Sequence, residues 1–560
     1  MKALDWIQPV LYVIALAAIS PYVGRWMHRL LNPPATNAPR LMDRVGELVV
    51  GQSWHNEMNW RSYLNALLIF NLMGFVLLLG LQLWQSHLPG NPAKLADVPF
   101  ALALNTAVSF VTNTNWQAYS GEATMSYLTQ MAGLGVQNFL SAATGLAVLL
   151  ALGRGLASKS GESLGNFWRD VVRGTLYVLL PLSALFAVVL VSQGVVQTFD
   201  EYTTVTTLEG REQVIPLGPA ASQIAIKQLG TNGGGFFGVN SAHPFENPTP
   251  LSNFLQVFAI LLLPAACVFL FAEMIGSRRH GWVIFGTMLG LLAAGFALAL
   301  WAEMQPNPSL GTSAILEGKE TRFGVMNSVL WSATTTAASN GSVNAMHDSL
   351  SPIAGGLALF NMMLGEVIFG GIGAGLYGML MFVVLTVFLA GLMVGRSPEY
   401  LGKKIEIREV VWAVIAVLLP CVILLTGAAI SCRSELGLSS LTNKGPHGLS
   451  EIVYAWASAA GNNGSAFGGL SANTSFYNYG LALAMFLGRF GIIIPALAIA
   501  GSLATKKSAP PSAGTFPTDG ATFGLLLGSV IVVVGGLTFV PVLSLGPIVE
   551  HFLLGGGVTF

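Results

Sequence analysis

Four short polar strings in this sequence have a composition suited to binding a dehydrated cation through backbone oxygens. Each string is made mainly of Gly, Asn, Ser and Thr, contains no charged residue, and follows a short run that is largely apolar. A ring of backbone carbonyl oxygens can replace the water shell of a cation without any charged side chain. We name the strings turns 1 to 4; they occupy residues 112–116, 230–234, 338–342 and 461–465.

The aligned positions of the four turns favour an ion filter over ordinary loops. Gly233, Gly341 and Gly464 align with one another, and Asn115 occupies the corresponding place in turn 1. Gly reaches left-handed backbone dihedrals at little steric cost, and Asn tolerates them better than most residues. A single string of this kind is most simply an ordinary surface turn, whereas four at nearly equal spacing favour a potassium filter. Its expected residues are Asn113, Thr114, Asn115, Thr231, Asn232, Gly233, Ser339, Asn340, Gly341, Asn462, Asn463 and Gly464.

The whole chain has the composition of an integral membrane protein. Of its 560 residues, 53% are hydrophobic and 9% are charged, whereas soluble domains usually carry about 25% charged residues. Ten apolar stretches come near or above the length of about 20 residues that a helix needs to cross a bilayer. They lie near residues 5–25, 62–84, 125–152, 171–193, 252–275, 281–302, 355–395, 409–430, 476–503 and 522–545.

The order of these stretches predicts an all-α polytopic membrane protein with four repeated helix–pore loop–helix units around one central pore. The apolar run 103–111 is too short to cross the membrane, so we expect it to enter and return. Such a segment is viable only where its free backbone groups line a polar path, and the negative ends of converging half-helices favour a cation. The expected segments are 1–61 and 508–560, each with an additional transmembrane helix, and the pore repeats 62–160, 161–280, 281–405 and 406–507.

The distribution of charge predicts how the chain is oriented in the membrane. The net charge is zero, so nothing indicates a nucleic-acid partner. Most of the 26 Lys and Arg residues lie in alternate loops. Because positively charged loops remain on the cytoplasmic side, we expect a multi-pass protein with both termini outside the cytoplasm.

The third repeat contains an apolar stretch, 355–395, that is about twice the length of one span. We expect a helix broken near Gly370, whose unwound part lines the path just inside the filter. A long tilted helix with Gly at packing contacts is the alternative. The gate or diverter that we expect comprises Glu366, Gly370, Gly371, Arg396 and Arg489.

Two ionisable residues of this group lie well inside spans, where an unpaired charge costs about 2.5–3.5 kcal/mol. Glu366 and Arg489 are expected either to form a structural ion pair or to act on the ion path, with Arg489 repelling cations that would leave toward the cytoplasm. Gln117, just beyond turn 1, is expected at the outer mouth of the filter, where it tunes affinity. A simple surface glutamine is the alternative for Gln117.

Several strings, taken together, resemble the KdpA family, the potassium-binding subunits of bacterial Kdp potassium-transporting ATPases in the superfamily of K+ transporters. The likeness runs the full length of the chain. One departure is Asn340, where the family pattern has Cys; because a carbonyl is the expected ligand, this difference bears on fine selectivity and not on the presence of the site. The strings that carry the resemblance are 105–121, 229–248, 335–348, 396–404, 459–473 and 486–491.

The resemblance implies high-affinity potassium uptake across the bacterial cytoplasmic (inner) membrane. The chain would bind extracytoplasmic K+ and pass it sideways to a P-type ATPase subunit, KdpB, in a complex with KdpC and KdpF. K+ is the transported ion, and no organic cofactor is implied. The chain lacks a Gly-x-x-x-x-Gly-Lys-Ser/Thr loop and an Asp-Lys-Thr-Gly string, so we expect a non-catalytic subunit whose energy comes from its partner.

Two other functions remain open on sequence grounds. A stand-alone potassium channel or cation-coupled symporter of the same superfamily would need no ATPase, and co-purification with a large ATP-hydrolysing partner distinguishes it. A structural or assembly subunit would conduct no ion, and replacing Gly233 by Asp would then leave potassium affinity intact.

Overall fold

Among the residues that the structure describes, ten helices are long and apolar enough to cross a membrane. The computed structural model describes residues 6–32, 44, 46–48, 50–159, 161–307, 316–508, 510 and 515–559. Parts of the predicted terminal and linking segments therefore lie outside the described residues, including 1–5, 33–43, 160, 511–514 and 560. The ten spans are Ile7–Leu31 (α1), Trp60–Leu83 (α3), Thr129–Ala157 (a π-helical turn and α6, Val136–Ala157), Phe167–Ser192 (α7, Phe167–Arg173, to α8, Leu180–Ser192), Pro250–Met274 (α10), Arg278–Glu303 (α11), Ala374–Met393 (α14), Ile407–Arg433 (α15), Ser475–Thr505 (α18) and Ala521–Gly555 (α19, Ala521–Leu543, to α20, Val549–Gly555).

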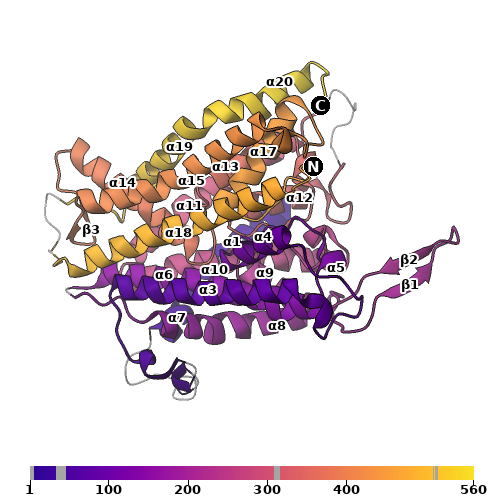
Figure 1. Ribbon diagram of the computed structural model, residues 1–560. Coiled ribbons are helices and arrows are strands. Elements are labelled where there is room, and N and C mark those ends of the chain that lie inside the picture. Colours follow the sequence, from indigo (N-terminus) through magenta and orange to yellow (C-terminus); the bar gives the residue numbers. More distant parts are fainter. Residues whose placement is uncertain are drawn as a thin grey trace.

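Four shorter helices each lead directly into one of the polar turns. They are α4 (Phe100–Val111), α9 (Ala220–Leu229), α12 (Gly324–Ala337) and α17 (Gly445–Ala460). All four lie toward the same end of the helix bundle, and both marked ends of the chain lie at that end as well (Figure 1). With 10 to 16 residues each, they enter the bundle without crossing it.

Burial alternates along the chain in a way that reflects the four repeated units. In each unit the span after the turn is the inner one: 67–83% of the residues in its apolar window are buried, against 22–39% for the span before the turn. The inner helices are α6, α10, α14 and α18. The first and last spans, α1 and α19 to α20, are also peripheral. The inner spans therefore surround the turns, and the outer spans separate them from lipid.

Side-chain caps define where several spans begin. The Asn59 side chain accepts hydrogen bonds from the backbone N–H groups of Arg61 and Ser62 at the start of α3. At the start of α10, Thr249 and Ser252 form a reciprocal capping box. Because these N–H groups have no partner inside the helix, such caps stabilise the chosen starting residue.

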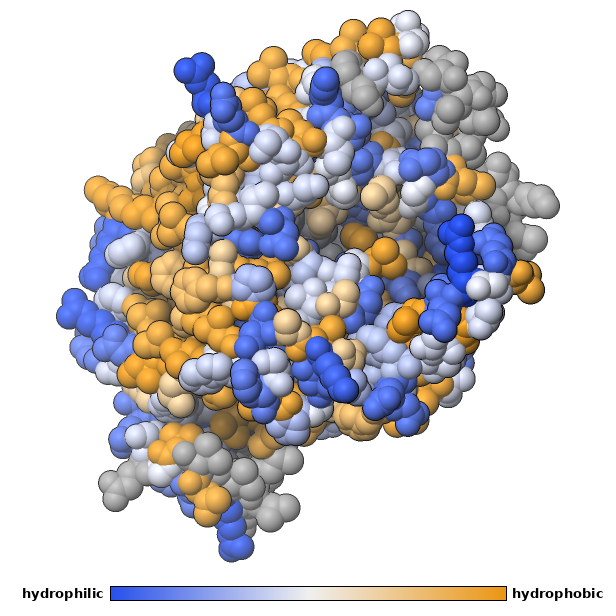
Figure 2. Space-filling view, turned by 45° about the vertical axis from the view of Figure 1, so that its right-hand side comes forward, coloured by the Kyte–Doolittle hydropathy of each residue, from blue (hydrophilic) through white to orange (hydrophobic). Residues whose placement is uncertain are grey.

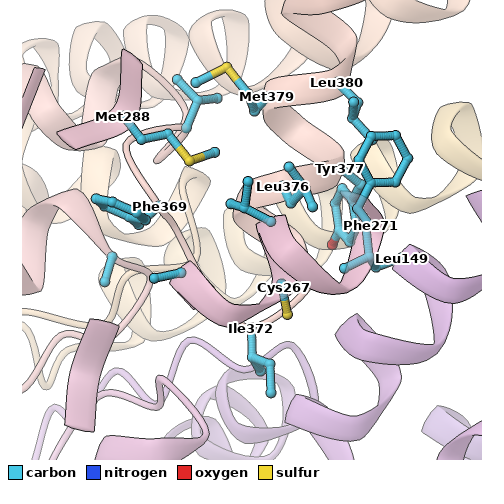
Figure 3. Packing of buried hydrophobic residues seen from close by; sticks show 14 of the residues in the cluster. Leu149, Cys267, Phe271, Met288, Phe369, Ile372, Leu376, Tyr377, Met379 and Leu380 are labelled. Atoms are coloured by element: carbon cyan, nitrogen blue, oxygen red, sulfur yellow. The ribbon is translucent and has the colours of Figure 1, made fainter. Parts of the chain in front are cut away.

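The long apolar stretch of the third repeat is broken, as expected from its glycines. Helix α13 (Pro352–Met363) ends well before α14 begins at Ala374. Five residues of the intervening segment 364–373 have left-handed backbone dihedrals, and three of them are Gly. In Figure 3, Ile372 of this segment lies near Cys267 of α10, and Phe369 lies near Met288 of α11; the ring centroids of Phe369 and Phe285 of α11 are 5.6 Å apart. The break is therefore packed into the core.

Two small hairpins lie outside the helical bundle and were not expected. Strand β1 (Thr203–Thr206) pairs antiparallel with β2 (Glu212–Ile215), and β3 (Glu399–Tyr400) pairs with β4 (Lys403–Lys404). The β1–β2 hairpin projects from the end that carries the short helices (Figure 1). Hydrophobic residues cover much of the flank of the molecule, and hydrophilic side chains gather at the end turned toward the viewer (Figure 2).

Candidate ion-binding site

The four polar turns are buried at the C-terminal ends of the four short helices. Helices α4, α9, α12 and α17 end at Val111, Leu229, Ala337 and Ala460, directly before turns 1 to 4. The aligned residues Thr114, Asn232, Asn340 and Asn463 have no exposed surface. Their burial excludes the interpretation of these strings as ordinary surface turns.

Backbone oxygens from three turns meet beside Gly233 of the remaining turn. A Cβ atom built on Gly233 would lie 3.0 Å from the carbonyl oxygen of Asn340 and 3.1 Å from that of Asn463, and closer still to that of Thr114. These three oxygens belong to aligned positions of turns 3, 4 and 1. Cβ atoms on Gly341 and Gly464 would likewise collide with carbonyl oxygens of neighbouring turns. The structure thus brings all four turns together around one axis.

Hydrogen bonds join the four turns into a closed ring. Asn113 Nδ2 donates to the carbonyl oxygen of Thr231 (2.9 Å), linking turns 1 and 2. Asn340 Nδ2 donates to that of Asn232 (3.1 Å), linking turns 2 and 3.

The other half of the ring is closed in the same manner. Asn463 Nδ2 donates to the carbonyl oxygen of Ala338 (2.8 Å), and Ser339 Oγ donates to that of Asn462 (2.7 Å). Asn462 Nδ2 donates to Thr114 Oγ1 (2.9 Å) and returns to turn 1. Because every turn is tied to both neighbours, the spacing of their backbones is fixed collectively.

The backbone dihedrals agree with three of the four expectations for the aligned position. Asn115, Gly341 and Gly464 have φ values of 56°, 74° and 95°. The expectation for Gly233 was wrong, because the left-handed residue of turn 2 is Gly234, with φ 68°. Gly233 is required for a different reason, since the carbonyl oxygens of the other turns leave no room for a Cβ.

Gln117 joins turn 1 to the backbone just beyond turn 2. Its Nε2 donates to the carbonyl oxygen of Gly235 (3.0 Å), and its Oε1 accepts from the Gly235 N–H (2.9 Å). The side chain is partly buried. This paired contact gives the side chain a specific backbone partner, and a role of Gln117 at the outer mouth stays a prediction.

A small cavity of about 30 Å³ lies beside the turns, between them and the broken helix. Gly371 packs against turns 2 and 3: a Cβ built on it would lie 3.3 Å from Thr231 Oγ1 and 3.0 Å from Ser339 Cβ. The backbone N–H of Ile372 donates to Thr231 Oγ1 (2.9 Å). The lining includes Ser339, Glu366, Gly371, Asn462 and Arg489.

The two ionisable residues share this cavity without forming the expected ion pair. Among the residues that the structure describes, no ion pair joins Glu366 to Arg489, although both are nearly fully buried. Arg489 Nη2 instead donates to the carbonyl oxygen of Ser141 on α6 (3.1 Å). The carbonyl oxygen accepts a hydrogen bond from the guanidinium but does not cancel its positive charge, which remains at the lining of the cavity.

Two other expected gate residues lie in different places. Gly370 has φ 58° and its N–H donates to the carbonyl oxygen of Ala337, so it holds the broken segment against the end of α12. Arg396 is exposed beyond the far end of α14, and its Nη1 donates to the carbonyl oxygen of Thr515. Since α14 has 20 residues, or about 30 Å of helix, the expectation that Arg396 belongs to this gate was wrong.

Several supporting side chains were not identified from the sequence. Ser141 and Asn138 on α6 contact Asn113 and Asn115 of turn 1. Behind turn 2, Lys227 of α9 forms a buried ion pair with Glu246 (2.7 Å). A charged residue inside a short membrane-entering helix was a signal for such a partner, because an unpaired charge is costly there.

The comparisons with known proteins agree with the membrane architecture and identify a family. A family model described as "Potassium-transporting ATPase A subunit" matches residues 10–552. A protein of Leptospira interrogans is 56% identical over 558 residues, covering 99% of this chain and all of that protein. Proteins of Pseudomonas syringae and Pseudomonas aeruginosa are 55% and 56% identical, with at least 98% of each chain covered. All three are named potassium-transporting ATPase potassium-binding subunit.

The fold is also similar to a solved structure. The potassium transporter TrkH from Vibrio parahaemolyticus matches with a TM-score of 0.52 over 88% of this chain and 98% of that chain. The sequences are 15% identical, so this likeness shows the fold alone. The all-α, ten-helix arrangement with four repeated units is thereby confirmed.

Proposed function

The chain belongs to the family of potassium-transporting ATPase A subunits, and on that premise we propose that its four turns form a potassium-selective filter that serves ATP-driven uptake. The filter receives K+ from outside the cytoplasm, and the chain passes the ion to a partner P-type ATPase subunit. The observation that carries this proposal is the meeting of the Thr114, Asn340 and Asn463 carbonyl oxygens beside Gly233.

The composition of the ring supports potassium as the ion bound there. The four turns contain no charged side chain, so binding depends on backbone dipoles. Carbonyl oxygens in a ring replace the hydration shell of K+, and the C-terminal ends of α4, α9, α12 and α17 add negative potential. The ligand residues are the twelve of the expected filter set. The hydrogen-bonded ring holds their backbones in place before the ion arrives.

The cavity beside the turns supports a gate or diverter at the inner side of the filter. Glu366, Gly370 and Gly371 form the broken segment, and Arg489 places a guanidinium in the cavity lining. A fixed positive charge there raises the barrier for a cation that would continue toward the cytoplasm. The ion therefore leaves the filter sideways, toward the partner subunit.

The same proposal includes the partner subunits of the chain and its location and orientation in the membrane. Membership of the family places it in a multi-pass complex with other ATPase subunits, for which we propose KdpB, KdpC and KdpF. The concentration of positive charge in alternate loops supports a bacterial cytoplasmic membrane location with both termini outside. In the structure both marked chain ends lie at the end where the short helices begin.

A flux measurement in vesicles tests transfer to the ATPase. The chain alone and the complete complex are reconstituted separately, and uptake of radioactive rubidium is followed with and without ATP. We expect ATP-dependent uptake by the complex and no ATP-independent flux through the chain alone. Sustained flux through the isolated chain would instead identify a stand-alone channel or symporter.

A further inference from the structure

A buried ion pair encloses turn 2 from behind. Lys227 lies in the last turn of α9, before turn 2, and Glu246 lies in the segment after it. Their side chains are 1% and 0% exposed, and the Nζ–Oε2 distance is 2.7 Å. Removing one partner would leave the charge of the other buried and uncompensated, so neither residue can be replaced alone without a large loss of stability.

Each member of the pair also contacts the backbone or a side chain near turn 2. Glu246 Oε1 accepts a hydrogen bond from the backbone N–H of Phe237 (2.9 Å). Lys227 Nζ donates to Ser241 Oγ (3.1 Å). The carboxylate also lies against the residue just after turn 2, since a Cβ built on Gly235 would be 2.7 Å from Glu246 Oε1. The chain before turn 2 is thus joined to the chain after it.

The pair is continuous with the hydrogen-bonded ring of the filter. The carbonyl oxygen of Lys227 accepts from the Asn232 N–H in turn 2 (2.8 Å) and from Asn340 Nδ2 in turn 3 (3.3 Å). On the opposite side, Gln117 holds Gly235 through two hydrogen bonds. A change in the Lys227–Glu246 distance would therefore move turn 2 relative to turns 1 and 3.

A second buried pair in the next repeat has the same chemistry at a different place. Lys319 Nζ and Glu303 Oε2 are 3.0 Å apart, and both side chains are fully buried. Their further contacts are the carbonyl oxygen of Ser349 and the N–H of Ser351, which lie after turn 3 and outside it. Lys319 precedes α12 altogether. This pair joins the chain before α12 to the loop after turn 3, and the whole of α12 separates it from that turn.

We propose that Lys227 and Glu246 are positioning residues that set the spacing of turn 2 and thereby contribute to the discrimination of potassium from sodium. The inference rests on the proposed filter function. Sodium is smaller than potassium, so a turn that is free to move inward can follow it. The ion pair prevents that movement because Glu246 contacts both Lys227 and the Phe237 N–H, which fixes the distance between these two residues on either side of turn 2. Since the pair is neutral overall, it does this without placing a net charge behind the ion.

The test replaces each pair by neutral residues of similar volume. The variants are Lys227→Met with Glu246→Gln, and the matched control Lys319→Met with Glu303→Gln. Affinities for K+ and Na+ are measured on the purified complete complex by calorimetry and by stimulation of ATP hydrolysis. We expect the first variant to lower the ratio of the sodium Kd to the potassium Kd at least tenfold. The control is expected to keep that ratio within twofold, whatever its thermal stability.

A milder variant keeps the test decisive if the first one does not fold. Ser241→Ala removes one hydrogen bond of Lys227 and keeps the ion pair, and we expect it to lower the same ratio two- to fivefold. An unchanged ratio in the folded turn 2 variants, or an equal fall in the control, would overturn the inference. Failure of the unmodified complex to bind K+ would instead contradict the proposed filter function, so the two failures are distinguishable.

Discussion

The four turns and the cavity beside them contain similar small and polar residues but are held together differently. In the ring, every turn is tied to both neighbours by side-chain hydrogen bonds to backbone or hydroxyl oxygens. In the cavity, two buried ionisable side chains, Glu366 and Arg489, share the lining, and no ion pair joins them among the residues that the structure describes.

This difference indicates two tasks in adjacent places. A ring whose backbones are fixed before binding loses little entropy when an ion enters, which favours tight and selective binding. The cavity instead contains two buried ionisable side chains that are not paired with each other, and ionisable residues at such positions inside a membrane are typical of ion pathways. We therefore propose that the ring provides selectivity and that the cavity releases the ion.

The largest expected effect comes from a side chain that blocks the space between the turns. Gly464→Ala places a Cβ against the carbonyl oxygen of Thr114 at a residue with φ 95°. We expect at least a hundredfold loss of potassium affinity in the complex, measured by titration of potassium-stimulated ATP hydrolysis. Gly286→Ala is the control, because a Cβ there meets nothing within 4 Å. Equal potassium affinity in the Gly464→Ala and Gly286→Ala variants would contradict the assignment of ion binding to the ring.

A smaller effect is expected from the cavity, and of a different kind. Arg489→Gln removes the positive charge from the cavity lining. We expect potassium affinity within about threefold of normal but about tenfold fewer rubidium ions accumulated per ATP hydrolysed, because ions leak past the diverter. Arg396→Gln should leave both quantities within twofold, since Arg396 lies beyond α14. A loss of affinity without leakage in the Arg489 variant would assign that residue to the ring.

Turn 1 sharpens the comparison within the ring. Asn115→Gly keeps the backbone compatible with φ 56° and removes the hydrogen bond to Asn138. We expect potassium affinity to fall no more than about tenfold, since one hydrogen bond contributes about 0.5–1.5 kcal/mol. Asn138→Ala should give a similar loss, and the two changes should not add. A tighter site in the Asn115 variant would show that Asn strains the ring.

The smallest effect on transport is expected outside both regions. His447 Nε2 lies 3.0 Å from Asp348 Oδ1, and its Nδ1 lies 2.7 Å from Glu550 Oε1 on α20. Burial alone would lower the pKa of His447, but the hydrogen bonds and charges of the two carboxylates raise the pKa to about 10. Stabilisation by the protonated ring is therefore complete below about pH 6.5 and is lost as the pH rises through about 10.

A pH series tests this histidine. The Tm advantage of the unmodified complex over His447→Gln should shrink between pH 6.5 and pH 10, with potassium affinity at pH 7 changed less than twofold. A Tm advantage that grows with pH would show that His447 is neutral in the folded protein.

The sequence was sufficient for the turns and the break because their backbone requirements select particular residue types. Left-handed dihedrals at Asn115, Gly341 and Gly464, and in segment 364–373, account for the Gly and Asn residues found there. Gly233 shows the limit of this reasoning. A Gly needed for its dihedrals and a Gly needed for close approach are identical in sequence, and only the arrangement of the other turns distinguishes them.

Partners across the fold were the part that could not be predicted. The ion pair joins Lys227 of α9 to Glu246 in a loop, so helical periodicity does not relate the two residues. The contact of Arg489 with Ser141 joins two different repeats. Such partners depend on how the inner helices pack. Arg396 was placed wrongly because a position in a characteristic string does not say which end of a span the residue occupies.

The most direct test is a density map of the complete complex prepared in rubidium, compared with one prepared without it. We predict one rubidium peak on the axis of the four turns, surrounded by the backbone oxygens of Thr114, Asn232, Asn340 and Asn463. A map in which rubidium is absent from this position, or in which the four turns stand apart, would contradict the account.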